Sequence, residues 1–349
     1  MKIAITFNLK RKSPSHGLPE DAFEEFDAPE TIDAIAAVFR GKGHTVCLIE
    51  ADSAFLEKIQ KEKPDFVFNI AEGYEGRNRE SYVPNILEFL SIPYSHSDGF
   101  TLATSLDKSL TKMIAKENGV RTPDSSVILS PKGEGSAFKT RSFTALRMTK
   151  FPLFLKPSSE GSSKGIRLSS LVNNEKEFES ECSRLWKNYG STPLLAEEYI
   201  RGREVTVGVL GTENPRVIGM MEIRWKKERE KKDFIYSLEV KRNWREWVEY
   251  EVPAPLNRAQ SEEIETMALK IHRALECRDV SRIDFRIDEQ GVPYFIEMNP
   301  LPGLSPDYSD LVIMIRQLGW TYDRLILSIL EEATGRYKRK ARRDMLPLL

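Results

Sequence analysis

The spacing of hydrophobic and polar residues changes partway along the chain. From residue 1 to residue 98, short apolar runs alternate with segments in which apolar residues recur every three or four positions. The runs MKIAITF, TVCLIE and DFVFNI predict buried strands, and the segments that begin at Glu30 and Val83 predict helices. Strands that alternate with helices predict a small parallel sheet with helices on both faces.

A second region begins near Asp107. The segment DKSLTKMIAKENG predicts a helix that is capped by Asp107, buries Leu110, Met113 and Ile114, and ends at Gly119. The Gly- and Ser-rich stretch SPKGEGSAFKTR predicts a mobile loop. Further on, short runs separated by turn residues predict an antiparallel sheet: FPLFLKP, GIRLSS, LLAEEYI, EVTVGVLG and RVIGMMEIR.

The last region combines helices with one hairpin. A helix from Ser261 carries a single apolar stripe, formed by Ile264, Met267, Ala268, Ile271 and Leu275. A hairpin follows, and then a helix around Tyr322 to Ala333. We therefore predict a mixed α/β protein divided into four segments: 1–98, 99–190, 191–335 and a basic tail, 336–349.

Composition narrows the function classes. The 349 residues include 52 Lys and Arg against 53 Asp and Glu, so the net charge of -1 gives no electrostatic reason to expect nucleic acid or an anionic membrane as partner. Only the stretch from Arg336 to Arg343, RYKRKARR, is strongly basic, and a charge run near a chain end predicts a solvated tail.

Localisation and redox state follow from a few further features. No window has the roughly 18 apolar residues of a membrane span, and MKIAITF lacks the long apolar core and cleavage site of a signal peptide. We therefore expect a cytoplasmic protein. Cys47, Cys182 and Cys277 are odd in number and widely spaced, which predicts reduced thiols rather than disulfides or zinc ligands.

The segment SRIDFRIDEQGVPYFIEMNP carries the strongest chemical signal. Strand alternation predicts two sets of side chains that each share a face: Arg282, Asp284 and Arg286, and then Phe295, Glu297 and Asn299. A two- or four-residue turn at DEQG would place Asp284 on the same face as Glu297 and Asn299. Two carboxylates and an amide, without His or Cys, suit Mg²⁺ that carries nucleotide phosphates. The alternative is a polar solvent face on an amphipathic hairpin.

A second signal lies in FPLFLKPSSEGSSKGIRLSS. Lys156 ends one strand, and the small flexible segment Ser158 to Gly165 separates it from the next. The backbone N–H groups of such a loop can surround phosphate oxygens. The loop is not a P-loop, because GxxxxGK[ST] at the start of a helix is absent, and by itself it is an ordinary turn. Lys156 and Lys108 would supply the positive charge that a triphosphate requires.

A third signal is the stretch LLAEEYIRGREVTVGVLG. Glu197 and Glu204 flank its RGR turn. A carboxylate near such a turn can accept hydrogen bonds from ribose hydroxyls. Taken alone, the stretch is equally consistent with a surface hairpin.

These segments, in this order, resemble the D-alanine:D-alanine ligases of the ATP-grasp superfamily, from about Ile70 to Ala333. The motifs that carry the resemblance are AEGYEG, SIPYS, SLDKSLTK, FPLFLKPSSEGSSKG, LLAEEYIRGREVTVGVLG, SRIDFRID and IEMNPLPG. The resemblance implies an ATP-grasp fold, with an N-terminal pre-ATP-grasp domain and two α+β subdomains that enclose ATP. It also implies a homodimer through the first domain.

The resemblance further implies a reaction and its cofactors. ATP would phosphorylate the carboxylate of one amino acid or peptide, the donor, to an acyl phosphate, which the amine of a second, the acceptor, would attack. The cofactors would be ATP and two Mg²⁺ ions, for which Mn²⁺ can substitute. The loop after Lys156 would act as the lid that excludes water.

Roles for individual residues are implied in the same way. The nucleotide would be bound by Lys108, Lys156, Glu160, Gly161, Ser162, Ser163, Gly165, Glu197, Glu198, Ile200 and Glu204. The metal ions would be held by Asp284, Glu297 and Asn299. The catalytic groups would be Ser162, Lys241, Arg282 and Gly303, of which Arg282 and the Gly303 amide would stabilise the oxyanion of the tetrahedral intermediate.

The chain departs from the family at the donor site. The family has a Gly-Gly-x-Ser-x-Glu turn after the first strand, whose Glu holds the donor ammonium, and here Glu24 or Glu25 falls near that place without the Gly-Gly turn. Arg242 follows Lys241 where the family has Tyr, which predicts a carboxylate or phosphate on the donor. Ser309 is the candidate acceptor-binding Ser, in a run one residue longer than usual.

Three functions therefore compete. The first is a ligase with D-alanine:D-alanine-type chemistry, with D-alanine or another amino acid or peptide as donor. The second is a nucleotide-binding regulator that has lost ligation, and the third is a small-molecule kinase that stops at the phosphorylated product. The retained Arg282, metal ligands and glycine-rich loop favour the first.

Overall fold

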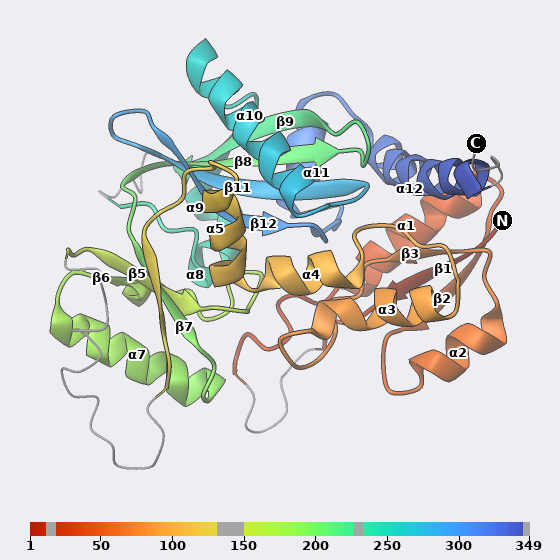
Figure 1. The fold of residues 1–349 in the computed structure, drawn as a ribbon, viewed down its shortest axis with the longest axis horizontal. Coiled ribbons are helices and arrows are strands. Elements are labelled where there is room, and N and C mark those ends of the chain that lie inside the picture. Colours follow the sequence, from red (N-terminus) through yellow and green to blue (C-terminus); the bar gives the residue numbers. More distant parts are fainter. Residues whose placement is uncertain (12–18, 131–149, 227–232, 345–349) are drawn as a thin grey trace.

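A computed structural model describes residues 1–11, 19–130, 150–226 and 233–344, in which the strands form three sheets (Figure 1). The first sheet is parallel, in the order β2-β1-β3, and its strands are β1 (Lys2–Phe7), β2 (Thr45–Glu50) and β3 (Phe66–Asn69). Its neighbouring helices are α1 (Pro29–Gly41), α2 (Phe55–Glu62) and α3 (Tyr82–Phe89). The predicted parallel β/α unit is thereby confirmed.

Alternation along β1 explains why this sheet has helices on both sides. Ile3 and Ile5 pack into a cluster with α1, whereas Ala4, between them, packs into a second cluster with α2 and α3. All three residues are fully buried. A sheet that is apolar on both faces requires two helical layers.

Helices α4 (Gly99–Leu106) and α5 (Lys108–Glu117) connect this domain to the rest of the chain, and Asp107 caps α5 as predicted. The predicted buried face of α5 is wrong, because Leu110 and Met113 are exposed. The buried face instead contains Lys108, Thr111, Lys112 and Ala115. Apolar spacing could not reveal it, since the two lysines are buried through pairing with carboxylates.

The second sheet is antiparallel and has the order β4-β7-β5-β6. Its strands are β4 (Ser125–Ile128), β5 (Leu153–Pro157), β6 (Leu171–Val172) and β7 (Leu194–Glu198), and it is packed against α7 (Glu175–Tyr189). The predicted strand GIRLSS is wrong, since Leu168–Ser170 is a 3₁₀ helix and only the next two residues pair with β5. Strand β7 lies past the predicted boundary at residue 190, and the predicted loop falls outside the described residues after Ser130.

The third sheet, in the order β10-β9-β8-β11-β12, is antiparallel as predicted. Its strands are β8 (Gly202–Leu210), β9 (Arg216–Trp225), β10 (Val248–Glu251), β11 (Val280–Asp288) and β12 (Pro293–Asn299). The short helices α8 (Leu238–Arg242) and α9 (Trp244–Trp247) precede β10. Helix α10 (Arg258–Ala274) covers one face with the predicted apolar stripe, so that prediction is confirmed.

The β11–β12 hairpin has the predicted register at its functional end. Asp284 lies opposite Glu297 and Arg282 lies opposite Asn299. A bulge after Asp284 then shifts the pairing, so that Phe285 lies opposite Phe295, with ring centroids 6.1 Å apart in the core. The prediction that Phe295 shares a face with Glu297 is therefore wrong, because the extra residue of a bulge inverts the alternation.

Two glycines position helix α11 (Asp310–Gln317) on the third sheet. Gly208 and Gly219 lie opposite each other in β8 and β9. A Cβ on Gly208 would come within 2.8 Å of a Leu311 methyl group, and one on Gly219 within 2.8 Å of the Met314 sulfur. The missing side chains allow α11 to approach the sheet closely, with its N-terminal end toward the cavity described below.

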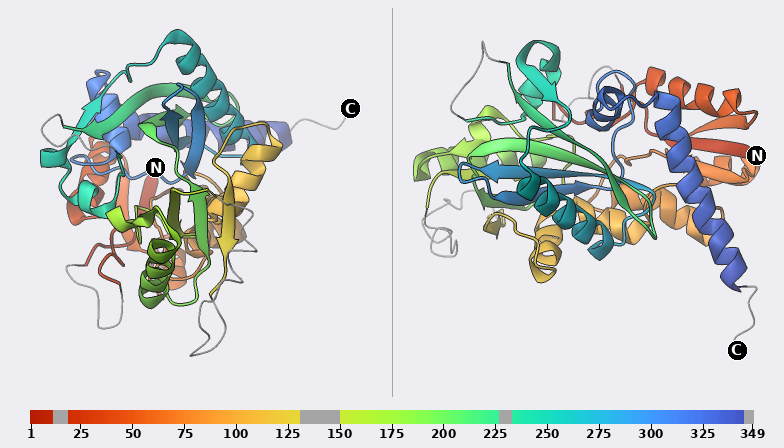
Figure 2. Two further views of the ribbon diagram at one scale, coloured as in Figure 1. Left: turned by 90° about the vertical axis from the view of Figure 1, so that its left-hand side faces the viewer. Right: turned by 90° about the horizontal axis from the view of Figure 1, so that it is seen from above.

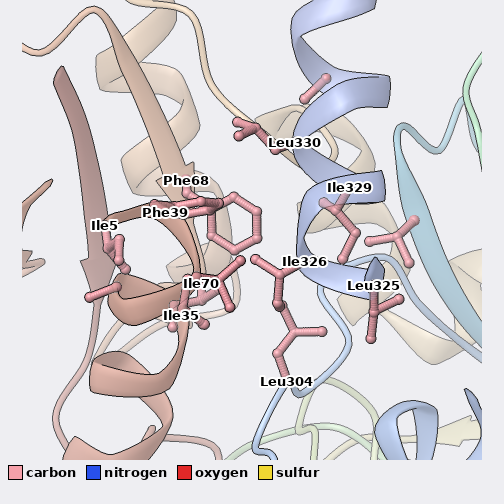
Figure 3. Close-up of a cluster of buried hydrophobic side chains, with 14 of the residues drawn as sticks. Ile5, Ile35, Phe39, Phe68, Ile70, Leu304, Leu325, Ile326, Ile329 and Leu330 are labelled. Carbon is pink, nitrogen blue, oxygen red and sulfur yellow. The ribbon is translucent and has the colours of Figure 1, made fainter. Parts of the chain in front are cut away.

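Helix α12 (Tyr322–Asp344) is longer than predicted and runs back along the first domain (Figure 2). Leu325, Ile326, Ile329 and Leu330 pack into one cluster with β1, β3 and α1 (Figure 3). The basic tail is therefore not a separate solvated end at its start, since Arg336 binds buried Asp279 at 3.0 Å.

Two further expectations can be compared with the structure. All three cysteines are free thiols, as predicted: Cys47 is half-buried, and Cys182 and Cys277 are buried. Among the helices that the structure describes, none is long and apolar enough to cross a membrane.

Candidate active site

Two adjoining cavities lie where the three sheets approach each other. The larger, of about 330 Å³, is bounded by the first domain, α8 and the segment after β12. The smaller, of about 90 Å³, lies between the second and third sheets. Five side chains line both cavities and so form their junction: Tyr236, Lys241, Arg282, Glu297 and Asp310.

The smaller cavity has apolar walls with charged groups around them, as a nucleoside site requires. Eight of the residues predicted to bind nucleotide or metal line it, namely Lys156, Ser163, Glu197, Glu198, Ile200, Glu204, Asp284 and Glu297. Phe154, Ile223 and Ile235 supply flat or branched apolar surface. The predicted nucleotide residues on β5, β7 and β8, far apart in the sequence, are thus brought together.

Glu197 is enclosed by two lysines. Its carboxylate oxygens lie 3.0 Å from Lys112 Nζ and 2.6 Å from Lys156 Nζ. Burial opposes its ionisation, but the two lysines hold its pKa below the usual value, while burial lowers the pKa of Lys112 to about 8. Lys112 was not predicted, although its position one helical turn after Lys108 on the same polar face of α5 was a usable signal.

Glu204 lines the smaller cavity beside Arg286. Their charged groups are 3.2 Å apart, and burial raises the pKa of Glu204 to about 7. The Arg286 guanidinium also donates to the Ile200 carbonyl at 2.6 Å and lies over the Tyr199 ring. Arg286 therefore holds the turn between β7 and β8 against the third sheet, and with it the predicted ribose-binding carboxylate.

The predicted metal ligands converge at the junction. Asp284 Oδ2 accepts hydrogen bonds from Asn299 Nδ2 at 3.2 Å and from Arg282 at 3.0 Å. Glu297 lies 3.5 Å from Lys108 Nζ; burial would raise its pKa, but Lys108 and Lys156 hold it at about 2. This site therefore offers ionised, hard oxygen atoms, which are the donors that Mg²⁺ prefers.

The donor set is suited to a metal that also binds phosphate. In the described parts of the chain, no three His, Cys, Asp or Glu side chains are grouped as a closed metal site. Asp284, Glu297 and Asn299 supply two carboxylates and one amide, which leaves coordination positions for nucleotide oxygens and water. The residues present thus fit a nucleotide-linked divalent ion rather than a structural one.

The glycine-rich loop after β5 lies over the junction. Ser162 and Ser163 both have a positive φ, 46° and 59°, and Ser163 Oγ donates to the Tyr236 carbonyl at 3.1 Å. Lys108 donates to the Glu160 carbonyl, so the predicted phosphate-binding lysine contacts the loop. Left-handed conformations at consecutive non-glycine residues are held by their surroundings, and such strain is concentrated at functional sites.

Two carboxylates of the N-terminal segment bind the glycine-rich loop. The sequence did not reveal these contacts. Glu25 accepts a hydrogen bond from the Gly161 N–H at 2.7 Å, and Asp21 accepts one from the Gly165 N–H at 3.0 Å. Glu25 is also paired with Arg79 at 2.7 Å and Lys164 at 3.2 Å. Burial opposes its ionisation, but these cations hold its pKa at about 2.

The predicted substrate residues Glu24 and Arg242 are paired with each other. Arg242 donates to Glu24 at 2.6 Å and also binds Glu20, while Lys10 lies 3.0 Å from the other Glu24 oxygen. The expectation that Arg242 attracts a carboxylate or phosphate on the donor is therefore not supported, because its charge is already neutralised. The sequence could not show this, since the partners are more than 200 positions apart.

The acceptor side of the larger cavity is formed by the start of α11. Ser309 precedes the helix, and its Oγ accepts a hydrogen bond from the Ser305 N–H at 2.8 Å. The Ser309 hydroxyl lies 2.9 Å from where a Cβ on Gly303 would be, so Gly303 leaves room for it. A helix N-terminus is favourable for a carboxylate, which agrees with the role expected for Ser309.

Comparisons with known proteins agree with this geometry. The family model described as D-ala D-ala ligase C-terminus matches residues 114–331. D-alanine--D-alanine ligase of Aquifex aeolicus is 31% identical over 301 residues, which are 86% of this chain and 94% of that protein. Uncharacterized protein y4sG of Sinorhizobium fredii is 30% identical over 313 residues, 87% of this chain and 88% of that protein.

Solved structures support the fold. D-alanine--D-alanine ligase from Bacillus anthracis in complex with ATP has a TM-score of 0.72 at 21% identity, covering 97% of this chain and 99% of that one. The VanG D-Ala:D-Ser ligase from Enterococcus faecalis has a TM-score of 0.70 at 20% identity, covering 95% and 99%. The predicted ATP-grasp architecture is therefore confirmed.

The family determines the class of reaction and cofactor. Its members are ATP-dependent ligases that use a divalent metal ion and act on small amino-acid substrates, which agrees with the two cavities and the acidic junction between them. This chain belongs to the D-alanine–D-alanine ligase family and is an ATP-dependent carbon–nitrogen ligase of that type.

Proposed function

We propose that this enzyme joins two amino acids, or an amino acid and a peptide, by activating the donor carboxylate as an acyl phosphate. The observation that carries the proposal is the junction at which Arg282, Glu297 and Asp310 line both the smaller cavity and the larger one. ATP in the smaller cavity would direct its γ-phosphate toward a carboxylate in the larger cavity. Each cavity would thus hold one of the two partners in phosphoryl transfer.

The first step forms a bond between a donor carboxylate oxygen and the γ-phosphorus, and ADP leaves. Lys108 and Lys156, which both act on Glu297, would compensate the phosphate charge. Two Mg²⁺ ions, held by Asp284, Glu297 and Asn299, would supply further charge neutralisation when bound. The glycine-rich loop would exclude water, which otherwise hydrolyses an acyl phosphate.

In the second step the neutral acceptor amine attacks the acyl carbon. The tetrahedral intermediate loses phosphate, and the nitrogen loses one proton, so that an amide remains. Arg282 is fixed by Asp284 and lies 3.7 Å from Asp310, which leaves its guanidinium at the junction where the oxyanion would form. The Gly303 amide would be the second donor to this oxygen.

A screen of paired amino acids tests the proposal. L- and D-amino acids would be combined with ATP and Mg²⁺, phosphate release would be measured, and products would be identified by mass. We expect an amide product together with equal amounts of ADP and phosphate. ADP with a phosphorylated product that needs no amine would indicate a kinase instead, and ATP binding without turnover would indicate a regulator. The cytoplasmic location and the homodimer expected from the sequence remain predictions.

The metal ligands provide a separate prediction. Asp284→Ala and Glu297→Ala should each lower kcat by at least about 100-fold, because the developing phosphate charge loses its divalent compensation. Thermal unfolding should show that the fold is retained, since both side chains border a cavity rather than a packed core. Unchanged activity in both variants would refute the metal assignment.

A further inference from the structure

Three carboxylates of the first domain line the larger cavity and have no part in nucleotide or metal binding: Asp27, Glu72 and Glu80. None of their side chains forms a hydrogen bond or an ion pair with another residue in the described ranges. Glu80 is only 7% exposed. Asp27 and Glu72 are half-buried. A poorly solvated carboxylate without a partner is neutralised either by a bound proton or by a cation, so a group of three at one cavity favours a ligand with positive charge.

Four cations near these carboxylates are already paired, and Lys241, which also lines the cavity, lies over the Tyr236 ring. Arg79 and Lys164 bind Glu25 and Glu160, and Lys10 binds Glu24 together with Arg242. The two positions expected to hold the donor ammonium, Glu24 and Glu25, are therefore neutralised within the protein. The carboxylates that remain without a partner in this cavity are Asp27, Glu72 and Glu80, of which Glu72 and Glu80 lie close to Glu25.

The pKa values of these three carboxyl groups reflect the lack of a cation beside them. Burial raises the pKa of Asp27 and of Glu80 to about 7, and burial together with Glu80 and Glu25 raises the pKa of Glu72 well above its usual value. Like charges that are close and poorly solvated resist ionisation unless a cation joins them. A ligand with positive charge would restore the ionised forms.

The geometry favours ammonium groups over a metal ion. Among the residues with described positions, no three carboxylate, His or Cys side chains are grouped closely enough to hold a metal. Asp27 comes from the segment before α1, Glu72 from the turn after β3 and Glu80 from the 3₁₀ helix Arg79–Ser81, so the charges are spread around the cavity wall. Spread carboxylates suit separate amines on one extended molecule.

Glu72 and Glu80 of this acidic wall lie on the donor side of the cavity. Burial and the nearby Asp27 carboxylate both raise the pKa of Tyr308, so Asp27 lies toward the acceptor side. Arg79, next to Glu80, donates to the Ser159 carbonyl of the glycine-rich loop at 3.0 Å, and Lys108 also contacts that loop. The acceptor side of the cavity is formed by Ser309, which comes from the C-terminal part of the sequence. A substrate against Glu72 and Glu80 therefore has its carboxylate near the loop that covers the phosphates.

We propose that the donor is a diamino acid, whose α-ammonium and side-chain ammonium bind the wall formed by Asp27, Glu72 and Glu80. This inference rests on the proposed ligase function and specifies its substrate class. The wall has three carboxylates for two ammonium groups, which leaves the donor carboxylate free to face the γ-phosphate. A neutral side chain would leave at least one buried carboxylate without a partner.

Matched donors test the proposal. Lysine, ornithine and 2,4-diaminobutyrate would each be compared with norleucine, norvaline and 2-aminobutyrate, in both configurations, with alanine and glycine as acceptors. We expect kcat/KM for ADP formation to be at least tenfold higher for the diamino acids, and tandem mass spectrometry should find the diamino acid's carboxylate in the amide bond. Equal or better turnover of neutral donors would overturn the inference and leave the ligase function intact. Absence of turnover with every pair would refute both.

Isosteric variants supply a second test. Glu72→Gln and Glu80→Gln should each lower the ratio of kcat/KM between a diamino donor and its neutral counterpart by at least tenfold. Glu57→Gln, on the exposed face of α2, is the matched control and should leave the ratio unchanged. Thermal unfolding checks that each variant folds. An unchanged ratio in both cavity variants would overturn the assignment of the wall.

Discussion

His272 is buried on α10, where its two ring nitrogens lie 2.8 Å from Ser281 Oγ and 3.0 Å from the Gly211 carbonyl oxygen. Its neighbours are neutral hydrogen-bonding groups rather than acids. Burial therefore lowers its pKa from 6.5 to about 4. In the neutral ring Nε2 donates to the Gly211 carbonyl and Nδ1 accepts from the Ser281 hydroxyl, so the residue joins α10 to β11 and to the residue after β8.

The pH dependence of stability should reveal this residue. Below pH 6.5 the unfolded chain binds a proton at position 272 that the folded chain does not, so the stabilisation is complete above pH 6.5 and is lost as the pH falls toward 4. The effect on the free energy of unfolding is up to about 1.4 kcal/mol per pH unit. In urea unfolding, His272→Gln should lose less stability than wild type between pH 7 and pH 5. Equal losses would contradict the prediction, and the pH 7 to 8 interval serves as the control.

At the scale of elements, the glycine-rich loop is held in place by both of its neighbours. Asp21 and Glu25 bind two of its N–H groups from the first domain, and the Leu238 N–H donates to its Ile166 carbonyl from the side of α8. Its shape is therefore a property of three segments. The loop sequence alone does not specify it.

Gly165 is a position where the loop has no room for a side chain. Its φ is +77°, and a Cβ there would come within 2.7 Å of Pro157. Gly43, after α1, has the same φ with nothing within 4 Å of its added Cβ. Both Gly→Ala variants should lose about 1 kcal/mol of stability from backbone strain. Only Gly165→Ala should also raise KM for ATP, measured by steady-state kinetics. Equal effects of both variants on KM would show that the contact with Pro157 is unimportant.

At the scale of the whole molecule, α12 joins the two ends of the chain. It packs against the first domain through the cluster in Figure 3 and belongs in sequence to the C-terminal part. Arg336 lies over the rings of Tyr94 and Tyr337 and binds Asp279, which is fully buried before β11. One ion pair thus connects α12 to the start of the strand that carries Arg282 and Asp284.

Removing this ion pair should destabilise the whole molecule. Arg336→Met leaves Asp279 buried without its cation and should lower the free energy of unfolding by about 3 kcal/mol, because an unpaired buried charge is costly. Lys338→Met, at an exposed position of the same helix, is the control and should change stability by less than about 0.5 kcal/mol. Denaturant unfolding measures both. Similar stabilities of the two variants would show that α12 is held by its apolar contacts alone.

Local patterns in the sequence determined most of the helices and strands, and also the part of the site formed by Asp284 and Glu297. The parallel unit, the α10 stripe and the register of Asp284 with Glu297 depend on side-chain periods of 3.6 and 2, which are read within a few residues. The buried lysines of α5 and the bulge between Phe295 and Glu297 were not predictable in this way. Each depends on contacts with residues outside the few positions over which a side-chain period is read.

The chain's own sequence therefore determined the ATP-grasp elements and the residues that would meet nucleotide and metal, because those lie in short, ordered motifs. Only the tertiary structure decided which charged side chains remain unpaired and can contact a substrate. It paired Arg242 with Glu24 and Glu25 with Arg79, and it left Glu72 and Glu80 facing the cavity. Whether a carboxylate is neutralised depends on distances between segments remote in the sequence, and Coulomb interactions in a buried site are decided by those distances.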